Sequence, residues 1–87
     1  ILVQSNDMCE TLATVPIDDL NQRMHFVLPE EADYDTIGGF AFHLFGRIPL
    51  VGETITSDGV SLEILACSSH QIDRLRVSRL PQTPDSP

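Results

Sequence analysis

The apolar residues between Tyr34 and Pro49 follow the spacing of a helix. They recur at the i, i+3, i+4 and i+7 positions of one buried helical face, as Ile37, Phe40, Ala41 and Leu44. Phe42 and Phe45 are expected to widen this face. Asp35 or Thr36 can cap the first turn, and Gly46 can take the left-handed conformation that ends a helix. Because Pro49 prevents the helix from resuming, we predict the core helix between Thr36 and Gly46.

The adjacent glycines Gly38 and Gly39 are unusual inside this predicted helix. Each costs a helix interior about 0.5–1 kcal/mol relative to alanine, so the missing side chains should allow another backbone or a ligand to come close. The pair matches neither a GxGxxG motif nor a P-loop, although backbone N–H groups at a helix start can receive an anion. Close packing is the favoured interpretation, and Gly38 and Gly39 stay open as cofactor-binding candidates.

The first third of the chain predicts two strands and a helix. Residues 1–4 and 8–13 are rich in strand-forming side chains and are separated by a turn at 5–7, with Met8, Glu10 and Leu12 on one side of the second strand. Pro16 suits the first position of a helix over residues 16–24, and Asp18 and Asp19 favour its first turn. Residues 25–28 are expected to be extended before Pro29.

The C-terminal half predicts three antiparallel strands. They cover residues 53–56, 60–66 and 71–79, with turns at 57–59 and 67–70. The apolar residues of the third strand, Ile72, Leu75 and Val77, break strict alternation once, which predicts a β-bulge. Residues 1–80 are therefore expected to form one α+β domain of two helices packed on a mostly antiparallel sheet. Residues 81–87, which contain three prolines counting Pro81, are predicted to be a disordered tail.

The charge of the chain is strongly acidic. Its 87 residues include 13 acidic residues and five arginines but no lysine, which gives a net charge of −8. This balance disfavours nucleic acid and anionic lipid surfaces as partners. The longest apolar stretch, residues 37–45, is much shorter than the ~20 residues needed to span a bilayer, so we expect no membrane insertion by this segment. Cys9 and Cys67 form no CxxC pair and indicate no zinc site or disulfide framework.

An acidic segment before the predicted core helix raises the question of a metal site. The metal-binding candidates are Glu30, Glu31, Asp33 and Asp35. Asp33, Asp35 and Gly38 match positions one, three and six of an EF-hand loop, but Ile37 and Leu44 stand where that loop needs oxygen ligands. A solvated acidic loop is the favoured interpretation, with weak binding of a hard cation as the minor alternative.

The sequence contains no convincing catalytic constellation. His25, His43 and His70 lack the HxxxH or HExxH spacing of a metal site. Ser68 and Ser69 precede His70, but this composition is typical of a turn and adjacency is not the geometry of a triad. We therefore predict that the domain is not an enzyme.

Six short blocks of sequence, taken together, resemble the CorC/HlyC transporter-associated domain. The blocks are 15–21 (VPIDDLN), 28–31 (LPEE), 34–39 (YDTIGG), 45–49 (FGRIP), 52–53 (GE) and 72–77 (IDRLRV). The resemblance covers about residues 1–80 and depends on the order and spacing of the blocks. One departure is Ala13, where this family usually has a glycine shortly before the first helix.

The resemblance implies a cytosolic C-terminal module of membrane proteins that also carry a transmembrane domain and a pair of CBS domains. Such proteins are described as magnesium and cobalt efflux proteins or as hemolysins. The implied function is regulation of ion transport through contacts with these neighbouring domains at the cytoplasmic face of the membrane. The fold is grouped with FAD-binding folds, so a flavin or adenine-nucleotide binding module is the alternative, although no cofactor is expected. The family supplies no catalytic residues.

A homodimer is a further prediction. Arg74 and Arg76 share one face of the last predicted strand and could meet carboxylates on a neighbouring strand or on another protomer.

Overall fold

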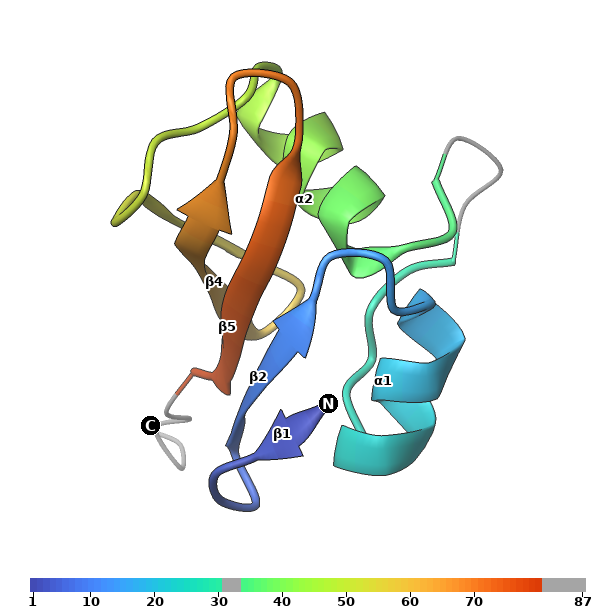
Figure 1. The fold of residues 1–87 in the computed structure, drawn as a ribbon. Coiled ribbons are helices and arrows are strands. Elements are labelled where there is room, and N and C mark those ends of the chain that lie inside the picture. Colours follow the sequence, from blue (N-terminus) through green and yellow to red (C-terminus); the bar gives the residue numbers. More distant parts are fainter. Residues whose placement is uncertain (31–33, 81–87) are drawn as a thin grey trace, which may run out of the picture.

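The computed structural model describes residues 1–30 and 34–80, and in these residues two helices cover one face of an antiparallel sheet (Figure 1). The elements are β1 Leu2–Val3, β2 Met8–Leu12, α1 Ile17–Met24, α2 Ile37–Phe45, β3 Thr54–Ser57, β4 Val60–Cys67 and β5 Ile72–Arg79. The strand order is β1-β2-β5-β4-β3, and every neighbouring pair is antiparallel. The predicted α+β class is confirmed. The predicted tail at 81–87 lies outside the described residues.

The strand β5 is the centre of this sheet. Its Val77 pairs with Cys9 of β2 and Leu62 of β4, and all three side chains are buried beneath the helices. On β2 the buried face carries Cys9 and Thr11, so the predicted row of Met8, Glu10 and Leu12 belongs to the opposite, open face. The core therefore lies between one face of the sheet and the two helices.

Arg74 and Arg76 lie on β5, the middle strand of the sheet, because the edge strands are β1 and β3. For Arg76 the first of the two predicted alternatives, a contact with carboxylates on neighbouring strands of its own chain, is confirmed. Arg76 Nη2 lies 3.3 Å from Glu10 Oε2 on β2, and its Nη1 lies 3.0 Å from Glu63 Oε1 on β4. The predicted homodimer thus loses the contact on which it was based.

The predicted bulge in the last strand is confirmed at Asp73. The register between β4 and β5 shifts twice. From Ile64–Leu75 to Ala66–Arg74 one residue of β4 is skipped, and from Ala66–Arg74 to Cys67–Ile72 one residue of β5 is skipped. Asp73 therefore lies between two paired residues of β5 and has no register partner on β4. This extra residue returns Ile72 to the buried face, which explains the broken alternation.

Helix α1 begins one residue later than predicted, because Pro16 has an extended backbone and serves as the N-cap. At its other end His25 is left-handed, with φ 57°. Arg79 then satisfies the free carbonyl groups of the last turn: its Nη2 donates to Met24 O at 2.7 Å, and its Nη1 donates to His25 O at 3.3 Å. Arg79 also forms an ion pair with Asp7, so it ties α1 to the turn between β1 and β2.

Helix α2 has the predicted ends. Thr36 Oγ1 accepts the Gly39 N–H at 3.1 Å, and Gly46 is left-handed with φ 72° and donates its N–H to Phe42 O. The width of its buried face was predicted less well. Phe42 is 48% exposed, and Phe45 is only partly buried against the core. The apolar face of α2 is therefore narrower than its sequence suggests.

Candidate functional site

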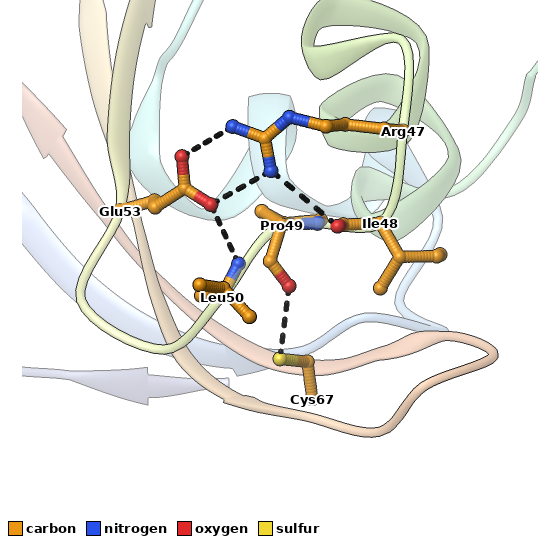
Figure 2. Close-up of polar contacts among 6 residues, drawn as sticks. All are labelled: Arg47, Ile48, Pro49, Leu50, Glu53 and Cys67. Carbon is orange, nitrogen blue, oxygen red and sulfur yellow. Dashed lines mark hydrogen bonds and ion pairs between the residues drawn. The ribbon is translucent and has the colours of Figure 1, made fainter.

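The loop that joins α2 to β3 is held in shape by an ion pair between its two ends. We call residues 46–53 the clamped loop. Arg47 Nη1 donates to Glu53 Oε2 at 2.8 Å, and Arg47 Nη2 donates to the other carboxylate oxygen (Figure 2). Glu53 Oε2 also accepts the Leu50 N–H at 2.7 Å. One carboxylate thus binds both a guanidinium group and the backbone at the tip of the loop.

These contacts change the acidity of the carboxyl group. The hydrogen bond from Arg47, and next the backbone N–H of Leu50, lower the pKa of Glu53 from 4.5 to about 2. The same hydrogen bond and the nearby negative charge raise the pKa of Arg47. Both groups are therefore charged at neutral pH, and the clamp is closed.

The clamped loop is also fastened to β4. Cys67 Sγ donates to Pro49 O at 3.2 Å (Figure 2), and the Gly52 N–H donates to Ile64 O at 2.8 Å. Gly52 has φ 94°, which side chains rarely tolerate, so a glycine is required at this bend. The backbone of the loop is thus fixed by contacts with the sheet as well as by its ion pair.

This fixed backbone presents two large apolar side chains to solvent. Leu50 is 72% exposed and Val51 is 61% exposed. Beside them is a hollow of about 440 Å³ whose lining comes from the loop and the end of β4: Ile48, Pro49, Leu50, Val51, Cys67, Ser68 and Ser69. Exposed apolar side chains on a preorganised loop are typical of a surface that another protein part covers, because little conformational entropy is lost on contact.

Sequence reasoning did not identify this surface, although the blocks at 45–49 and 52–53 entered the resemblance. The available signal was an arginine and a glutamate that bracket four apolar residues and a glycine. A salt bridge six residues apart in a loop has no regular spacing that a pattern could reveal.

The glycines of α2 allow close contact between two parts of the backbone. A Cβ on Gly38 would lie 2.5 Å from Ala13 Cβ and 2.8 Å from Ala13 O. A Cβ on Gly39 would lie 3.1 Å from Tyr34 Cβ, which is tight but leaves room for adjustment. At Gly38 the missing side chain is therefore explained by packing of α2 against the end of β2.

The first N–H groups of α2 are already hydrogen-bonded within the chain. Ile37 N donates to Val15 O at 3.0 Å, and Gly38 N donates to Ala13 O at 2.9 Å. The third, on Gly39, is taken by the Thr36 cap. A phosphate group at this helix start would have to break one of these bonds, so the usual source of anion binding is absent from this end of α2.

Only part of the acidic segment lies in the described residues. Glu30 and Asp35 line one small hollow of about 300 Å³ together with Asp18, whereas Glu31 and Asp33 lie outside the described residues. Within 1–30 and 34–80, no group of three or more histidine, cysteine, aspartate or glutamate side chains is arranged to hold a metal ion.

The histidines and the serine pair serve local structure. The His43 ring lies 5.3 Å from that of Tyr34, on the exposed side of α2. Ser68 Oγ accepts the backbone N–H groups of His70 and Gln71, each at 3.2 Å, which stabilises the turn between β4 and β5. Ser68 and His70 thus meet through the backbone, and the geometry of a nucleophile and its base is not formed here.

Neither helix in the described part of the chain has the length and apolar character that crossing a bilayer requires.

Fold and site together define a small α+β domain that, within the described residues, exposes two apolar side chains on a loop held by an ion pair. The model of the CorC/HlyC family, described as the transporter associated domain, matches residues 3–81, so the chain belongs to this family. The resemblance found in the sequence is confirmed. The family is a transporter-associated domain and is not a known family of enzymes.

Relatives of the domain occur in larger transport proteins. The chain is 36% identical over 77 residues to the magnesium and cobalt efflux protein CorC of Salmonella typhimurium, covering 86% of this chain and 24% of that protein. It is 30% identical over 73 residues to the polyamine export protein of Salmonella typhimurium, covering 83% of this chain and 16% of that protein. The chain thus spans less than a quarter of the length of these two relatives.

A solved structure supports the same fold. The transporter associated domain of a Xylella fastidiosa Temecula1 hemolysin, in complex with Mg²⁺ and Mn²⁺, superimposes with a TM-score of 0.75 at 30% identity. The match covers 93% of this chain and 96% of that one. The two helices and the antiparallel sheet are therefore common to both domains.

Proposed function

We propose that this chain is a regulatory interaction domain of a membrane transport protein and does not itself catalyse a reaction. The names of its relatives support this role, since one exports magnesium and cobalt and another exports polyamines. A domain shared by proteins with such different cargo is better suited to a common task than to selecting the cargo. Regulation of the transport domain is such a task.

The observation that carries the proposal is the exposure of Leu50 and Val51 on the clamped loop. Burying these two side chains against a partner would remove a large apolar area from water, at about 25 cal/mol per Å². The partners proposed are the neighbouring CBS and transmembrane domains of the parent protein, met at the cytoplasmic face of the membrane. The Arg47–Glu53 pair would hold the loop ready for this contact.

The test uses the full-length parent protein and two matched valine substitutions. Val51→Asp places a charge in the proposed contact surface, whereas Val27→Asp places the same charge at a valine that is 84% exposed and far from the clamped loop along the chain. We expect Val51→Asp to change the efflux of Mg²⁺, Co²⁺ or a polyamine from cells and Val27→Asp to leave efflux unchanged. Equal efflux from both variants and the wild type would overturn the proposal.

Divalent cation binding by the acidic segment is a second candidate, favoured by the Mg²⁺ and Mn²⁺ complex of the Xylella fastidiosa relative. The residues proposed are those predicted from the sequence: Glu30, Glu31, Asp33 and Asp35. Added Mn²⁺ should broaden the NMR signals of residues around Asp35 in the wild type and not in Asp35→Asn. Broadening that is equally strong at Asp58, on the turn between β3 and β4, would indicate nonspecific attraction to an acidic protein.

A further inference from the structure

Another hollow on the described surface lies where three elements meet. Its volume is about 540 Å³, within the usual range of sites for small organic molecules. One wall is the outer side of α2, another is the end of β2, and the third is the turn between β4 and β5. The lining is Leu12, Ala13, Thr14, Thr36, Gly38, Gly39, Phe42, Ile48, His70, Gln71, Ile72 and Asp73.

Two of the residues that line this hollow have large apolar side chains that remain about half exposed to solvent. Leu12 is 54% exposed and Phe42 is 48% exposed. Gly38 and Gly39 of α2 also line the hollow and add no side chain to its wall. An aliphatic or aromatic stem could therefore lie against Leu12 and Phe42 and remove both from water.

The bulge in β5 supplies the carboxylate of this hollow. Asp73 is the extra residue of the strand and is one of the residues that line the hollow. Asp73 Oδ1 accepts a hydrogen bond from Gln71 Nε2 at 3.0 Å. Within the described part of the chain, Oδ2 accepts none. A bulge beside a hollow is a common way to redirect one side chain toward a ligand.

The charges around the hollow favour a cation over an anion. His70 is the only lining side chain that can carry a positive charge, and the chain as a whole has a net charge of −8. The N–H groups of Gly38 and Gly39, which line the hollow, are already bonded to Ala13 O and Thr36 Oγ1. A phosphate or carboxylate ligand would thus meet a carboxylate and no free donor from these two residues.

We propose that this hollow binds an organic cation, a primary amine on an aliphatic stem. Its ammonium group donates to Asp73 Oδ2, and its stem lies against Leu12 and Phe42. Leu50 and Val51 do not line this hollow, although Ile48 of the clamped loop lines both this hollow and the one beside Leu50. Amine binding to the isolated chain is measured without a docking partner, so its failure is distinguishable from failure of docking through the clamped loop.

The first experiment is calorimetry of the 87-residue chain with three probes of equal carbon number. Pentane-1,5-diamine carries positive charge, pentan-1-ol carries none and pentanoate is negative. We expect saturable one-to-one binding of the diamine alone. NMR amide shifts caused by the diamine should centre on Gly39, Phe42 and Gln71. Absence of saturable diamine binding, or equal binding of pentanoate, would overturn the proposal.

Two aspartate variants separate a specific contact from general attraction. Asp73→Asn removes the proposed partner of the ammonium group and should weaken diamine binding about tenfold. Asp58→Asn changes the net charge by the same amount at the turn between β3 and β4, next to the opposite end of the β4–β5 pair, and should leave the affinity unchanged. Equal weakening by both substitutions would show that only net charge matters and would refute the site.

A third variant tests the apolar part of the site without changing charge. Phe42→Ser should also weaken diamine binding, and because Phe42 is half exposed, the fold should survive, as circular dichroism would check. Undiminished binding by Phe42→Ser would exclude the proposed placement of the stem.

Discussion

The two ends of α2 are held in place by different kinds of contact. At its start, backbone meets backbone: Gly38 packs on Ala13 and donates to Ala13 O at 2.9 Å. Beyond its last turn the contact is between charged side chains, because Arg47 forms an ion pair with Glu53 across the clamped loop. The first arrangement leaves no room for a side chain, and the second leaves two apolar side chains in solvent.

The first kind of contact mainly stabilises the fold, whereas the second mainly fixes the shape of the loop that exposes Leu50 and Val51. A close backbone contact in the core contributes to folding and is indifferent to pH. An exposed ion pair contributes little to folding, but it restricts the shape of a loop. Substitutions at the start of α2 should therefore change the unfolding free energy, whereas substitutions in the clamped loop should mainly change what the loop can contact.

The largest expected effect is that of Gly38→Ala. The added methyl group would meet Ala13 Cβ at 2.5 Å, and two packed backbones have to separate to admit it. Overpacking of this kind costs about 1–3 kcal/mol of unfolding free energy. The midpoint of urea unfolding should fall accordingly.

Gly39→Ala is the matched control for this substitution. Its added methyl group would meet side-chain atoms of Tyr34 and Thr36 at 3.1 and 3.3 Å, and alanine favours a helix by about 0.5–1 kcal/mol. The unfolding midpoint should therefore change much less than in Gly38→Ala. Equal loss of stability in both variants would show that the two glycines serve the same purpose.

A smaller effect is expected from Thr36→Ala, which removes the N-cap of α2. The Gly39 N–H would lose its acceptor at 3.1 Å, at a cost of about 1 kcal/mol. Thr36→Ser keeps the oxygen and should retain most of the stability in thermal or urea unfolding. If serine fails to restore it, the methyl group of Thr36 matters more than its hydroxyl group.

At the other end of α2, the Arg47–Glu53 ion pair should make a small contribution to stability that depends on pH. Because folding lowers the pKa of Glu53 to about 2, its contribution to stability is complete above about pH 4.5 and is lost as the pH falls toward 2. The difference in urea midpoint between the wild type and Glu53→Gln should be constant above pH 5 and shrink below pH 4. NMR titration of the Glu53 carboxyl group should give a midpoint near 2, and a midpoint near 4.5 would mean that the clamp is open in solution.

The smallest effect is expected on adding FAD, which should bind only weakly. The start of α2 would be the natural place for a pyrophosphate, but its N–H groups are bonded to Val15, Ala13 and Thr36. We expect FAD to bind no more tightly than about millimolar, equivalent to about −4 kcal/mol. Calorimetry checks this, and micromolar affinity would revive the flavin-binding alternative.

Local signals in the sequence predicted the elements well. The caps of α2 at Thr36 and Gly46, and the bulge in the last strand, follow from residue types and spacing over a few positions. The exposure of Phe42 was missed because α2 is apolar around most of its circumference, so its sequence does not show which side chains the sheet covers. The central place of β5 was missed as well, because pairing between β2 and β5 joins residues about 65 positions apart and leaves no local trace.

The candidate site was predicted least well. Gly38 and Gly39 were singled out correctly as a place of close approach, but only coordinates distinguish the backbone of Ala13 from a ligand. Asp73 was not singled out from the sequence and entered only as part of the block at 72–77. Its relation to Phe42 depends on how α2 crosses the sheet, and no pattern along the chain contains that information.

The central position of β5 has a consequence for how the domain is made. Among the described elements β5 is the last to emerge during synthesis, yet both halves of the sheet pair with it. The leading hairpin and the β3–β4 hairpin therefore have no common partner until Arg79 has left the ribosome. Folding should then occur in one late step that closes the longest loops of the chain, and such closure is slow compared with forming local contacts. Any parent protein with this domain would carry its apolar core unassembled until translation has passed the final strand.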